Sequence, residues 1–432
     1  MNTLTGAVAA SLLLSFSAAG SCFALGSHQV LNQTPTVQPA AHVFSVLRYG
    51  ATGNGTTDDT VAIQNTISAA QSSGLNSVVY FPPGSYLFSS NLTASNVSMS
   101  GETGASTTLL SSNNATVNFT QGQGAKVYIA NLTFQPQGGT GGTALNVGEN
   151  NTQVLNNTFG SGFTTSLSIN SAQSVLVSNN TFNIGTTSHA TAISGNSCGS
   201  LSIQQNTISG AQSTTLTGIS INSSSTTITK NTINGNIQDI ATSNSNPIGI
   251  YCSAKVDESS SITNNVINGS STGIYINNTG APSISNNNIT NAWSNGVYTV
   301  DSNPNIQQNI ITSVLNGAGI QVTGSSPVER GNVTVSRNTV SSTGGASISL
   351  SGYSVANTFY VSQNALTNAG LKFKTQAVID CTEVGIYSAN VTQNIYRGNT
   401  TNLTYFVYVQ QQGQAAGNKT NTMLPSQVNA HK

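Results

Sequence analysis

A motif of Asn, any residue and then an apolar residue recurs ten times along this chain, at steps of 22 to 34 residues. Such a period is typical of repeat architectures, in which one repeat cannot bury its apolar side alone. Stacking the repeats in order buries a continuous core, so the motif predicts one solenoid. The copies are Asn157-Thr-Phe159, Asn180-Thr-Phe182, Asn206-Thr-Ile208, Asn231-Thr-Ile233, Asn265-Val-Ile267, Asn287-Asn-Ile289, Asn309-Ile-Ile311, Asn338-Thr-Val340, Asn364-Ala-Leu366 and Asn394-Ile-Tyr396.

A second series, a small residue followed by apolar-x-apolar, keeps the same period. Two strand signals in each repeat indicate a coil of several short strands and exclude an array of helices. Stacked coils lie ~4.8 Å apart, with equivalent residues above one another. The two series together predict an all-β fold, a parallel β-helix. The apolar residues of the second series are Leu145, Leu167, Ile193, Ile219, Ile250, Ile274, Val297, Ile320 and Ile348.

The repeated Asn residues favour a structural role. In each copy the Asn side chain points to the same side as the apolar residue two positions later, so stacked copies can form an amide ladder at an inner turn. Asn also tolerates the left-handed backbone conformation that sharp turns require. We therefore expect the ladder to hold the coils in register.

The segment between residues 42 and 102 has a different pattern. Asp58 and Asp59 are N-cap candidates for a short amphipathic helix that ends before Gly74. A Pro-Gly turn then separates two short strands in the run Val78 to Phe88. The apolar residues with helical spacing are Val61, Ile63, Ile67 and Ala70.

Several motifs in this segment occur in a recognisable order. The run YGATGNGTTDDTVAIQNTISAA, with VVYFPPGSYLF and VSMSGE after it, resembles the N-terminal signature of the pectate lyase-like (pectin-lyase fold) superfamily. The resemblance spans Phe44 to Glu102 and implies a single-stranded, right-handed parallel β-helix whose short helix closes the N-terminal end. Such a cap is also a physical requirement, because an open strand edge invites association with another chain.

Charge is scarce, since only 5% of the residues are Asp, Glu, Lys or Arg and the eleven acids balance the eleven bases. A neutral chain without a basic stripe argues against nucleic acid, which is bound mainly through Lys and Arg on phosphates. It also argues against a charged membrane surface. No run after the N-terminus reaches the ~18 apolar residues of a membrane span.

The ends of the chain differ in composition from the repeats. Residues 1–24 are typical of a secretory signal with a cleavage site at Cys22-Phe23-Ala24, which predicts a secreted protein. The alternative is a lipid anchor at Cys22, because Ala19-Gly20-Ser21-Cys22 resembles a lipobox. We expect a flexible leader at 25–41, the β-helix domain at 42–410 and a disordered tail at 411–432.

One cluster of ionisable groups follows a strand of the repeat. Lys255, Asp257 and Glu258 come directly after the strand that holds Tyr251, and Asp301 occupies the matching bend two coils later. Glu329 and Arg330 follow in the next coil. A second group lies near the C-terminal end, where we expect surface ion pairs among Lys372, Lys374, Asp380 and Glu383.

Alternation places three tyrosines outside in successive coils. Tyr251, Tyr275 and Tyr298 align on their apolar neighbours, so their rings should stack on the outer face, with Gln321 next. Sugar C–H faces pack on aromatic rings, and sugar hydroxyls bond to acids and amides. The sequence therefore predicts a polysaccharide-binding face that combines these tyrosines with Arg330 and the acidic cluster.

Two chemistries fit this cluster. A hydrolase would use Asp301 and Asp257 as acid and base, about 10 Å apart, near the upper end of the ~6.5–9.5 Å range of inverting glycosidases. A lyase would need Lys255 or Arg330 as a base. Ca²⁺ held by Asp257, Glu258 or Asp301 could then neutralise a uronate carboxylate.

The catalytic motifs of the best-known enzymes with this fold are missing. The chain lacks the Asn-Thr-Asp, Asp-Asp, Gly-His-Gly and Arg-Ile-Lys series of polygalacturonases, the Asp-Pro-His-Glu of alginate epimerases and the Asp-rich calcium cluster of pectate lyases. Two hypotheses therefore stay open: a secreted polysaccharide lyase or glycoside hydrolase, and a non-catalytic glycan-binding or adhesive β-helix protein. The sequence indicates no oligomeric state.

Overall fold

The structure is a computed structural model, and it describes residues 42–409 and 422–423 with several gaps. The gaps are residues 75, 123, 186–189, 211–215, 224, 236–246, 254–259, 278–279, 325–330, 352–357, 374, 382–387 and 399–402. The predicted signal at 1–24 and the leader at 25–41 lie outside the described residues.

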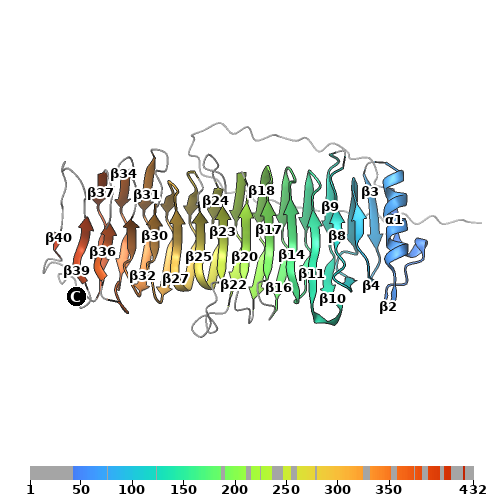
Figure 1. The fold of residues 1–432 in the computed structure, drawn as a ribbon, viewed down its shortest axis with the longest axis horizontal. Coiled ribbons are helices and arrows are strands. Elements are labelled where there is room, and N and C mark those ends of the chain that lie inside the picture. Colours follow the sequence, from blue (N-terminus) through green and yellow to red (C-terminus); the bar gives the residue numbers. More distant parts are fainter. Residues whose placement is uncertain are drawn as a thin grey trace, which may run out of the picture. The chain divides into compact units, whose positions relative to one another are not determined.

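The described strands form a stack of coils, each with three faces (Figure 1). A 14-stranded parallel sheet makes face 1, and a 26-stranded sheet makes faces 2 and 3 because two of its strands, β25 and β27, run through the corner between them. The predicted right-handed parallel β-helix is confirmed. Face 1 consists of β1 (His42–Ser45), β3 (Ser77–Phe81), β6 (Val97–Gly101), β9 (Val127–Ala130), β12 (Thr152–Leu155), β15 (Val175–Ser178), β18 (Ser200–Gln204), β21 (Ser225–Thr229), β24 (Ser260–Thr263), β26 (Ser283–Ser285), β28 (Asn305–Gln307), β31 (Asn332–Ser336), β34 (Thr358–Ser362) and β37 (Ser388–Thr392).

Faces 2 and 3 follow face 1 in each coil. Face 2 consists of β2 (Asn54–Asp58), β4 (Gly84–Phe88), β7 (Thr107–Ser111), β10 (Thr133–Pro136), β13 (Thr158–Phe159), β16 (Thr181–Ile184), β19 (Thr207–Gly210), β22 (Thr232–Asn234), the first halves of β25 (Val266–Asn277) and β27 (Asn288–Val300), β29 (Ile310–Val314), β32 (Thr339–Thr343), β35 (Ala365–Thr367) and β38 (Ile395–Arg397). Face 3 consists of β5 (Leu92–Ala94), β8 (Val117–Phe119), β11 (Gly141–Val147), β14 (Phe163–Asn170), β17 (Thr191–Asn196), β20 (Thr217–Asn222), β23 (Ile248–Ser253), the second halves of β25 and β27, β30 (Ile320–Thr323), β33 (Ile348–Ser351), β36 (Thr375–Cys381) and β39 (Leu403–Val409). Two short 3-10 helices, η1 (Val46–Tyr49) and η2 (Gln137–Gly139), lie between strands.

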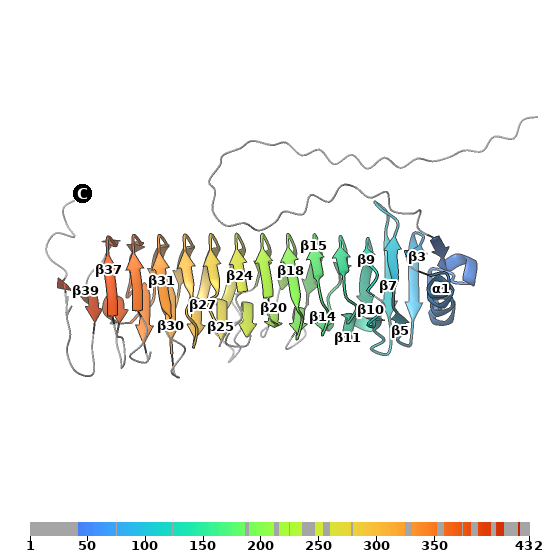
Figure 2. The ribbon, with the colours of Figure 1, turned by 90° about the horizontal axis from the view of Figure 1, so that it is seen from above.

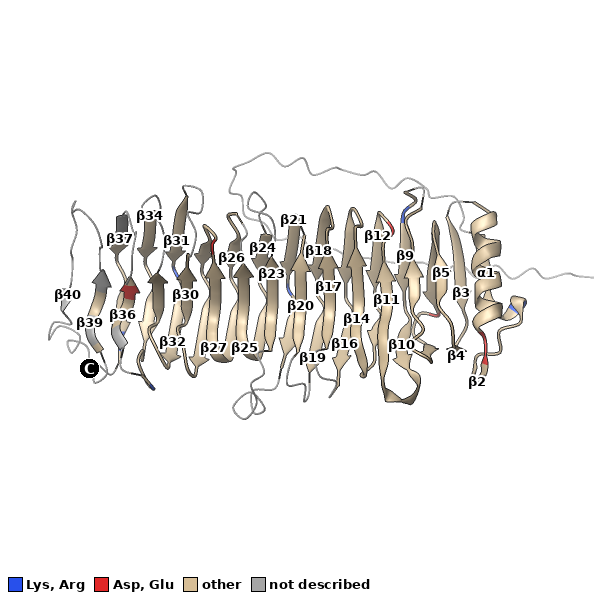
Figure 3. Cartoon of the chain, in the orientation of Figure 1, with Lys and Arg blue, Asp and Glu red and all other residues tan. Residues whose placement is uncertain are grey.

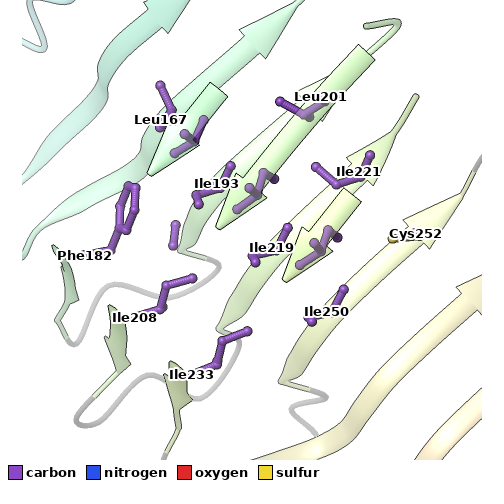
Figure 4. Packing of buried hydrophobic residues seen from close by; sticks show 14 of the residues in the cluster. Leu167, Phe182, Ile193, Leu201, Ile208, Ile219, Ile221, Ile233, Ile250 and Cys252 are labelled. Carbon is purple, nitrogen blue, oxygen red and sulfur yellow. The ribbon is translucent and has the colours of Figure 1, made fainter. Parts of the chain in front are cut away.

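Apolar side chains of equal position stack inside the coils (Figure 4). Phe134, Phe159 and Phe182 form one inner column, with ring centroids 4.9 and 4.7 Å apart and nearly parallel planes. Ile208 and Ile233 continue this column in the next two coils. Alternate residues of each strand thus point into the coil and pack on the equivalent residues of the neighbouring coils, as the two sequence series predict.

The predicted asparagine ladder is present from Asn157 to Asn394. Each ladder Asn donates its side-chain Nδ2 to the Oδ1 of the next, over 2.8 to 3.1 Å. The same Oδ1 accepts the backbone N–H of the preceding ladder Asn. The ladder therefore satisfies buried backbone groups at the turn between faces 1 and 2.

The left-handed conformation at this turn belongs to the residue before each ladder Asn and not to the ladder Asn itself. These preceding residues have φ between 54° and 57°. The residue that turns the chain leaves the ladder Asn free to point inward. Four of the ten turn residues are Asn, which among residues with a side chain tolerates a left-handed backbone well. The turn residues are Asn156, Asn179, Gln205, Lys230, Asn264, Asn286, Gln308, Arg337, Gln363 and Gln393.

Helix α1 (Thr60–Ser72) covers the N-terminal end of the stack, where it replaces the face 3 strand of the first coil (Figure 2). Ile63, Ile67 and Ala70 are buried against the first coils. Val61 is 71% exposed, against expectation, because it lies two positions before Ile63 and so on the other side of the helix. The side chain of Asp59 makes no cap; its buried carboxylate accepts hydrogen bonds from the 52–53 turn. Asp58 instead accepts the Thr60 N–H over 2.9 Å.

The C-terminal end is closed in a different way. The predicted last strand is β39, which pairs in parallel with β36. A two-residue strand, β40 (Thr422–Met423), pairs antiparallel with β39, so these two residues of the predicted disordered tail are ordered. The physical reason is the free edge of β39, whose N–H and C=O groups need a partner.

Candidate functional site

The outward side chains of face 3 form one column in strand register. Tyr251 pairs with Tyr275, Tyr275 with Tyr298, and Tyr298 with Gln321. These three tyrosines are called the Tyr column below. Before it the same column holds Asn118, Asn146, Ser168, Ser194 and Ser220, and after it Gln321, Ser349 and Asp380.

The rings of the Tyr column stack on the outer surface, as the alternation predicts. The Tyr275 and Tyr298 ring centroids are 5.1 Å apart with planes at 8°, and those of Tyr251 and Tyr275 are 5.3 Å apart with planes at 57°. All three residues are half-buried. Partial burial, with smaller effects of the neighbouring phenols, raises the pKa of Tyr275, so this phenol is neutral at physiological pH. The result is an uncharged aromatic platform that stays open to solvent.

A column of glycines at the adjacent corner accounts for this close stacking. A Cβ atom added at Gly249 would lie 2.5 Å from the carbonyl oxygen of Gly273, and one added at Gly273 would lie 2.6 Å from that of Gly296. Only glycine permits backbones to approach so closely. The sequence Gly-apolar-Tyr in three successive coils thus brings the tyrosines together.

Asp301 lies at the end of β27, beside the Tyr column. It adopts a left-handed conformation with φ of 49°, and its backbone N–H donates to the Thr323 carbonyl over 2.9 Å. Its charge is the smallest of the causes that raise the pKa of Tyr275. Asp301 follows Tyr298 of the Tyr column by three positions. Lys255, Asp257, Glu258 and Arg330 lie outside the described residues. The pairing of Asp301 with Asp257 therefore stays a prediction.

Asp380 is a face 3 residue that the sequence analysis assigned to surface ion pairs. Its register partner is Ser349, which places it in the outward column three coils after Tyr298. Continuing the apolar-x-apolar series by one coil, to Ile379 and Cys381, would have found it. Three steps of ~4.8 Å separate it from Tyr298 by about 14 Å. Lys374 and Glu383 of the same group lie outside the described residues.

An uncharged polar strip precedes the Tyr column on face 3. Asn146 donates to Asn118, Asn170 to Asn146 and Asn196 to Asn170, over 3.0 to 3.3 Å. Ser168 and Ser194 each accept a further amide hydrogen bond from Asn170 and Asn196. Hydroxyls and amides fixed at one-coil intervals thus continue the platform along the stack.

Charged side chains are sparse on the strands (Figure 3). Within the described part of the chain, no group of three or more His, Cys, Asp or Glu residues could hold a metal ion. The proposed Ca²⁺ ligands Asp257 and Glu258 lie outside the described residues. Among the described residues, no helix is long and apolar enough to cross a membrane.

Two family models match this chain. The model described as rhamnogalacturonase A/epimerase, pectate lyase-like, matches residues 43–298, which is more than half of the chain. The model described as periplasmic copper-binding protein (NosD) matches residues 237–377. Both matches include the whole Tyr column and the ionisable residues that follow β23, and the second also includes Asp301.

Solved structures resemble the fold at low sequence identity. The A-module of the Azotobacter vinelandii mannuronan C-5 epimerase AlgE6 is 15% identical with a TM-score of 0.51, over 82% of this chain and 99% of that one. The catalytic unit of a GH87 α-1,3-glucanase from Streptomyces thermodiastaticus is 16% identical with a TM-score of 0.53, over 83% and 69%. No curated protein matches. At such identities the likeness concerns the fold alone.

Proposed function

This chain belongs to the rhamnogalacturonase A/epimerase, pectate lyase-like family, and we propose that it binds and cleaves a polysaccharide along face 3. The observation that carries the proposal is the Tyr column, whose half-exposed rings stack in register over three coils. Pyranose C–H faces pack on such rings. A sugar chain lying along the stack would contact all three tyrosines and then the Asn and Ser strip.

The acid Asp301 is our candidate for the chemistry. It follows Tyr298 by three positions, directly after strand β27, so a sugar that packs on the Tyr column would lie on the strand that leads to it. In a hydrolase it would share proton transfer with Asp257, one residue as acid and the other as base. In a lyase, Lys255 or Arg330 would remove the proton, and Ca²⁺ on Asp257, Glu258 or Asp301 would neutralise the substrate carboxylate.

A non-catalytic glycan-binding protein is the second candidate, and one distance favours it. Asp301 and Asp380 are the carboxylates that the structure describes at face 3 beside and after the Tyr column, and three coils separate them, which is at least ~14 Å. Inverting glycosidases hold their carboxylates ~6.5–9.5 Å apart, and retaining ones hold them closer. The described residues alone therefore do not make a glycosidase pair.

The test is an assay on pectin, alginate, chondroitin and xylan, with absorbance of unsaturated products for a lyase and reducing ends for a hydrolase. We expect Asp301→Asn to abolish cleavage, and Asn tolerates the left-handed backbone at this position, so the fold should survive. Asp380→Asn is the matched control, and we expect it to stay active. Activity that survives Asp301→Asn contradicts the catalytic assignment.

Binding is tested separately, by retardation of the protein in polysaccharide-containing gels. Tyr275→Ala should lose the retardation, whereas Tyr275→Phe, which keeps the ring, should retain most of it. Retardation without cleavage by the native protein supports the glycan-binding candidate. Retardation that is unchanged in Tyr275→Ala contradicts the proposal for face 3.

Secretion is part of the same proposal. Cleavage after Ala24 would remove Cys22, whereas a lipid anchor would retain it as the first residue. The mass of the mature protein from the producing cell distinguishes the two.

A further inference from the structure

A surface hollow of about 290 Å³ lies at the corner between faces 2 and 3, in the last third of the stack. It is separate from the Tyr column, although Trp293 at its border and Tyr298 share strand β27. The hollow follows the ends of β29 and β32 and is closed by the segment 371–373. Its described lining consists of Ser313, Val314, Leu315, Ser342, Gly344, Leu371 and Lys372.

Backbone hydrogen bonds hold this corner in place. Leu371 N–H donates to the Thr343 carbonyl over 3.0 Å, and the N–H groups of Lys372 and Phe373 donate to the Gly344 carbonyl over 3.2 and 3.0 Å. A Cβ atom at Gly344 would lie 2.2 Å from the Leu315 carbonyl oxygen, so glycine is required there. The segment 371–373 is therefore anchored in the stack.

Lys372 reaches back from this segment to earlier coils. Its Nζ lies 5.4 Å from the centroid of the Trp293 ring and 5.6 Å from that of Phe373. The ammonium also donates to Oδ1 of Asn316. Two rings and an amide thus hold one positive charge at the edge of the hollow, and an ammonium has three N–H groups to donate.

Large apolar side chains are exposed at the same corner. Leu315 is 42% exposed, Leu371 53% and Phe373 47%, on a surface built otherwise from Ser, Thr and Asn. A contiguous apolar patch rimmed by polar groups is typical of a binding site. The hydroxyls of Ser313 and Ser342 lie on the rim of the same hollow.

We propose that this hollow is a saccharide subsite that takes a sugar carrying an anionic group, a carboxylate or a sulfate. The anion accepts hydrogen bonds from Lys372, the apolar face of the sugar packs on Leu315 and Leu371, and the serines bond to hydroxyls. Lys372 is the one ionisable group among the described lining residues, which is why the charge is assigned to it. The inference rests on the proposed function only in taking the ligand to be a saccharide.

Trp293 is the single tryptophan of the chain, so intrinsic tryptophan fluorescence reports on this corner alone. The native protein is titrated with glucuronic acid, with glucose 6-sulfate and with glucose, which lacks the anion. We expect saturable fluorescence changes with one or both anionic sugars and none with glucose at the same concentrations. Comparing the two anionic sugars distinguishes carboxylate from sulfate.

The charge is tested with two substitutions at one position. Lys372→Gln should weaken binding of the anionic sugar at least about tenfold, the expected effect of losing one charge-assisted hydrogen bond. Lys372→Arg keeps the cation and should retain binding. Circular dichroism and the unfolding temperature check that both variants are folded, and Lys126→Gln is the control for net charge. An equal response to glucose and glucuronic acid overturns the proposal.

A further variant separates this proposal from the one for face 3. Tyr275→Ala should leave the tryptophan response unchanged, because Tyr275 does not line the hollow. Gel retardation that depends on Tyr275, combined with no tryptophan response to any of the three sugars, overturns the subsite and leaves the proposed function standing. A response that Tyr275→Ala preserves, in a protein that no polysaccharide retards, supports the subsite and contradicts the proposed function.

Discussion

At the scale of a residue, Asn231 shows how one side chain links three coils. Its Nδ2 donates to Oδ1 of Asn265 over 3.0 Å and to the Ile203 carbonyl over 2.9 Å. Its Oδ1 accepts the backbone N–H and the Nδ2 of Asn206, both over 3.0 Å. The residue is fully buried, so water cannot replace these bonds. An unmade buried hydrogen bond costs more than a made one contributes.

We therefore expect Asn231→Ala to lower the free energy of unfolding by about 3 kcal/mol, since it leaves the Asn206 N–H and the Ile203 carbonyl without partners at ~1–3 kcal/mol each. Asn394→Ala is the matched control at the end of the ladder. Because Asn394 is only half-buried, water can form hydrogen bonds with the groups that lose their partner. The free energy of unfolding should therefore fall by about 1 kcal/mol. Urea denaturation measures both, and equal losses would contradict the ladder argument.

At the scale of an element, strand β4 contributes the buried ring of Tyr86 to the N-terminal cap. The Tyr86 hydroxyl donates to the Pro82 carbonyl over 2.9 Å, and its ring packs edge-on against Phe81 at 5.4 Å. Burial, followed by the negative charge of Asp59, raises the pKa of Tyr86 to about 12. Its ordinary pKa is 10.0, so the native state keeps the phenol protonated where the unfolded chain would ionise it.

This shift predicts a loss of stability at alkaline pH. A raised native pKa contributes stability that is present below pH 10, and that stability falls as the pH rises toward 12. Tyr86→Phe cannot ionise, so its curve should fall less steeply than that of the native protein in this window. At pH 8 the variant should be less stable by about 1 kcal/mol, because it lacks the hydrogen bond to Pro82.

The measurement is urea denaturation at several pH values between 8 and 12. The buried thiols of Cys252 and Cys381, whose pKa values burial also raises to about 12, act equally in both proteins and cancel in the difference. A difference between the two proteins that does not change with pH would contradict the assignment to Tyr86.

At the scale of the whole molecule, stability is a sum over coils and the contacts between neighbours. Every described coil from β12 onward repeats one plan: a face 1 strand, a left-handed residue, a ladder Asn, and then faces 2 and 3. Equivalent positions pair directly across coils, as Thr181, Thr207 and Thr232 do on face 2. Removing one coil should therefore leave equivalent positions of the remaining coils paired with one another.

We expect a protein that lacks residues 207–231 to fold. The deletion removes one full repeat and joins Asn206 to Thr232, the residue that follows the equivalent ladder Asn of the next coil. Deleting 207–218 instead removes part of a coil and sets strands of different faces above one another, so that chain should aggregate or unfold. Far-ultraviolet circular dichroism and thermal unfolding compare the two. If the full-coil variant does not fold and the partial-coil variant does, strand register is not what holds the stack together.

Much of the architecture follows from local pattern. The period of the Asn motif predicts the coils, and alternation predicts that Ile250 and Cys252 point inward while Tyr251 points outward. These predictions succeed because strand alternation and one-coil stacking depend only on residues close in sequence and on a repeat that returns them to the same position. The stacked Tyr column follows from the same two rules.

The tertiary structure alone decides which distant side chains meet. Asp380 joins the outward column of face 3, and Lys372 reaches Trp293 across intervening coils. Repeats of 22 to 34 residues differ mainly in their corners, and periodicity does not encode the path of a corner. The sequence by itself therefore determined a β-helix and its inner and outer columns. Close packing at the corners, where glycines let backbones touch, decided the site and the hollow.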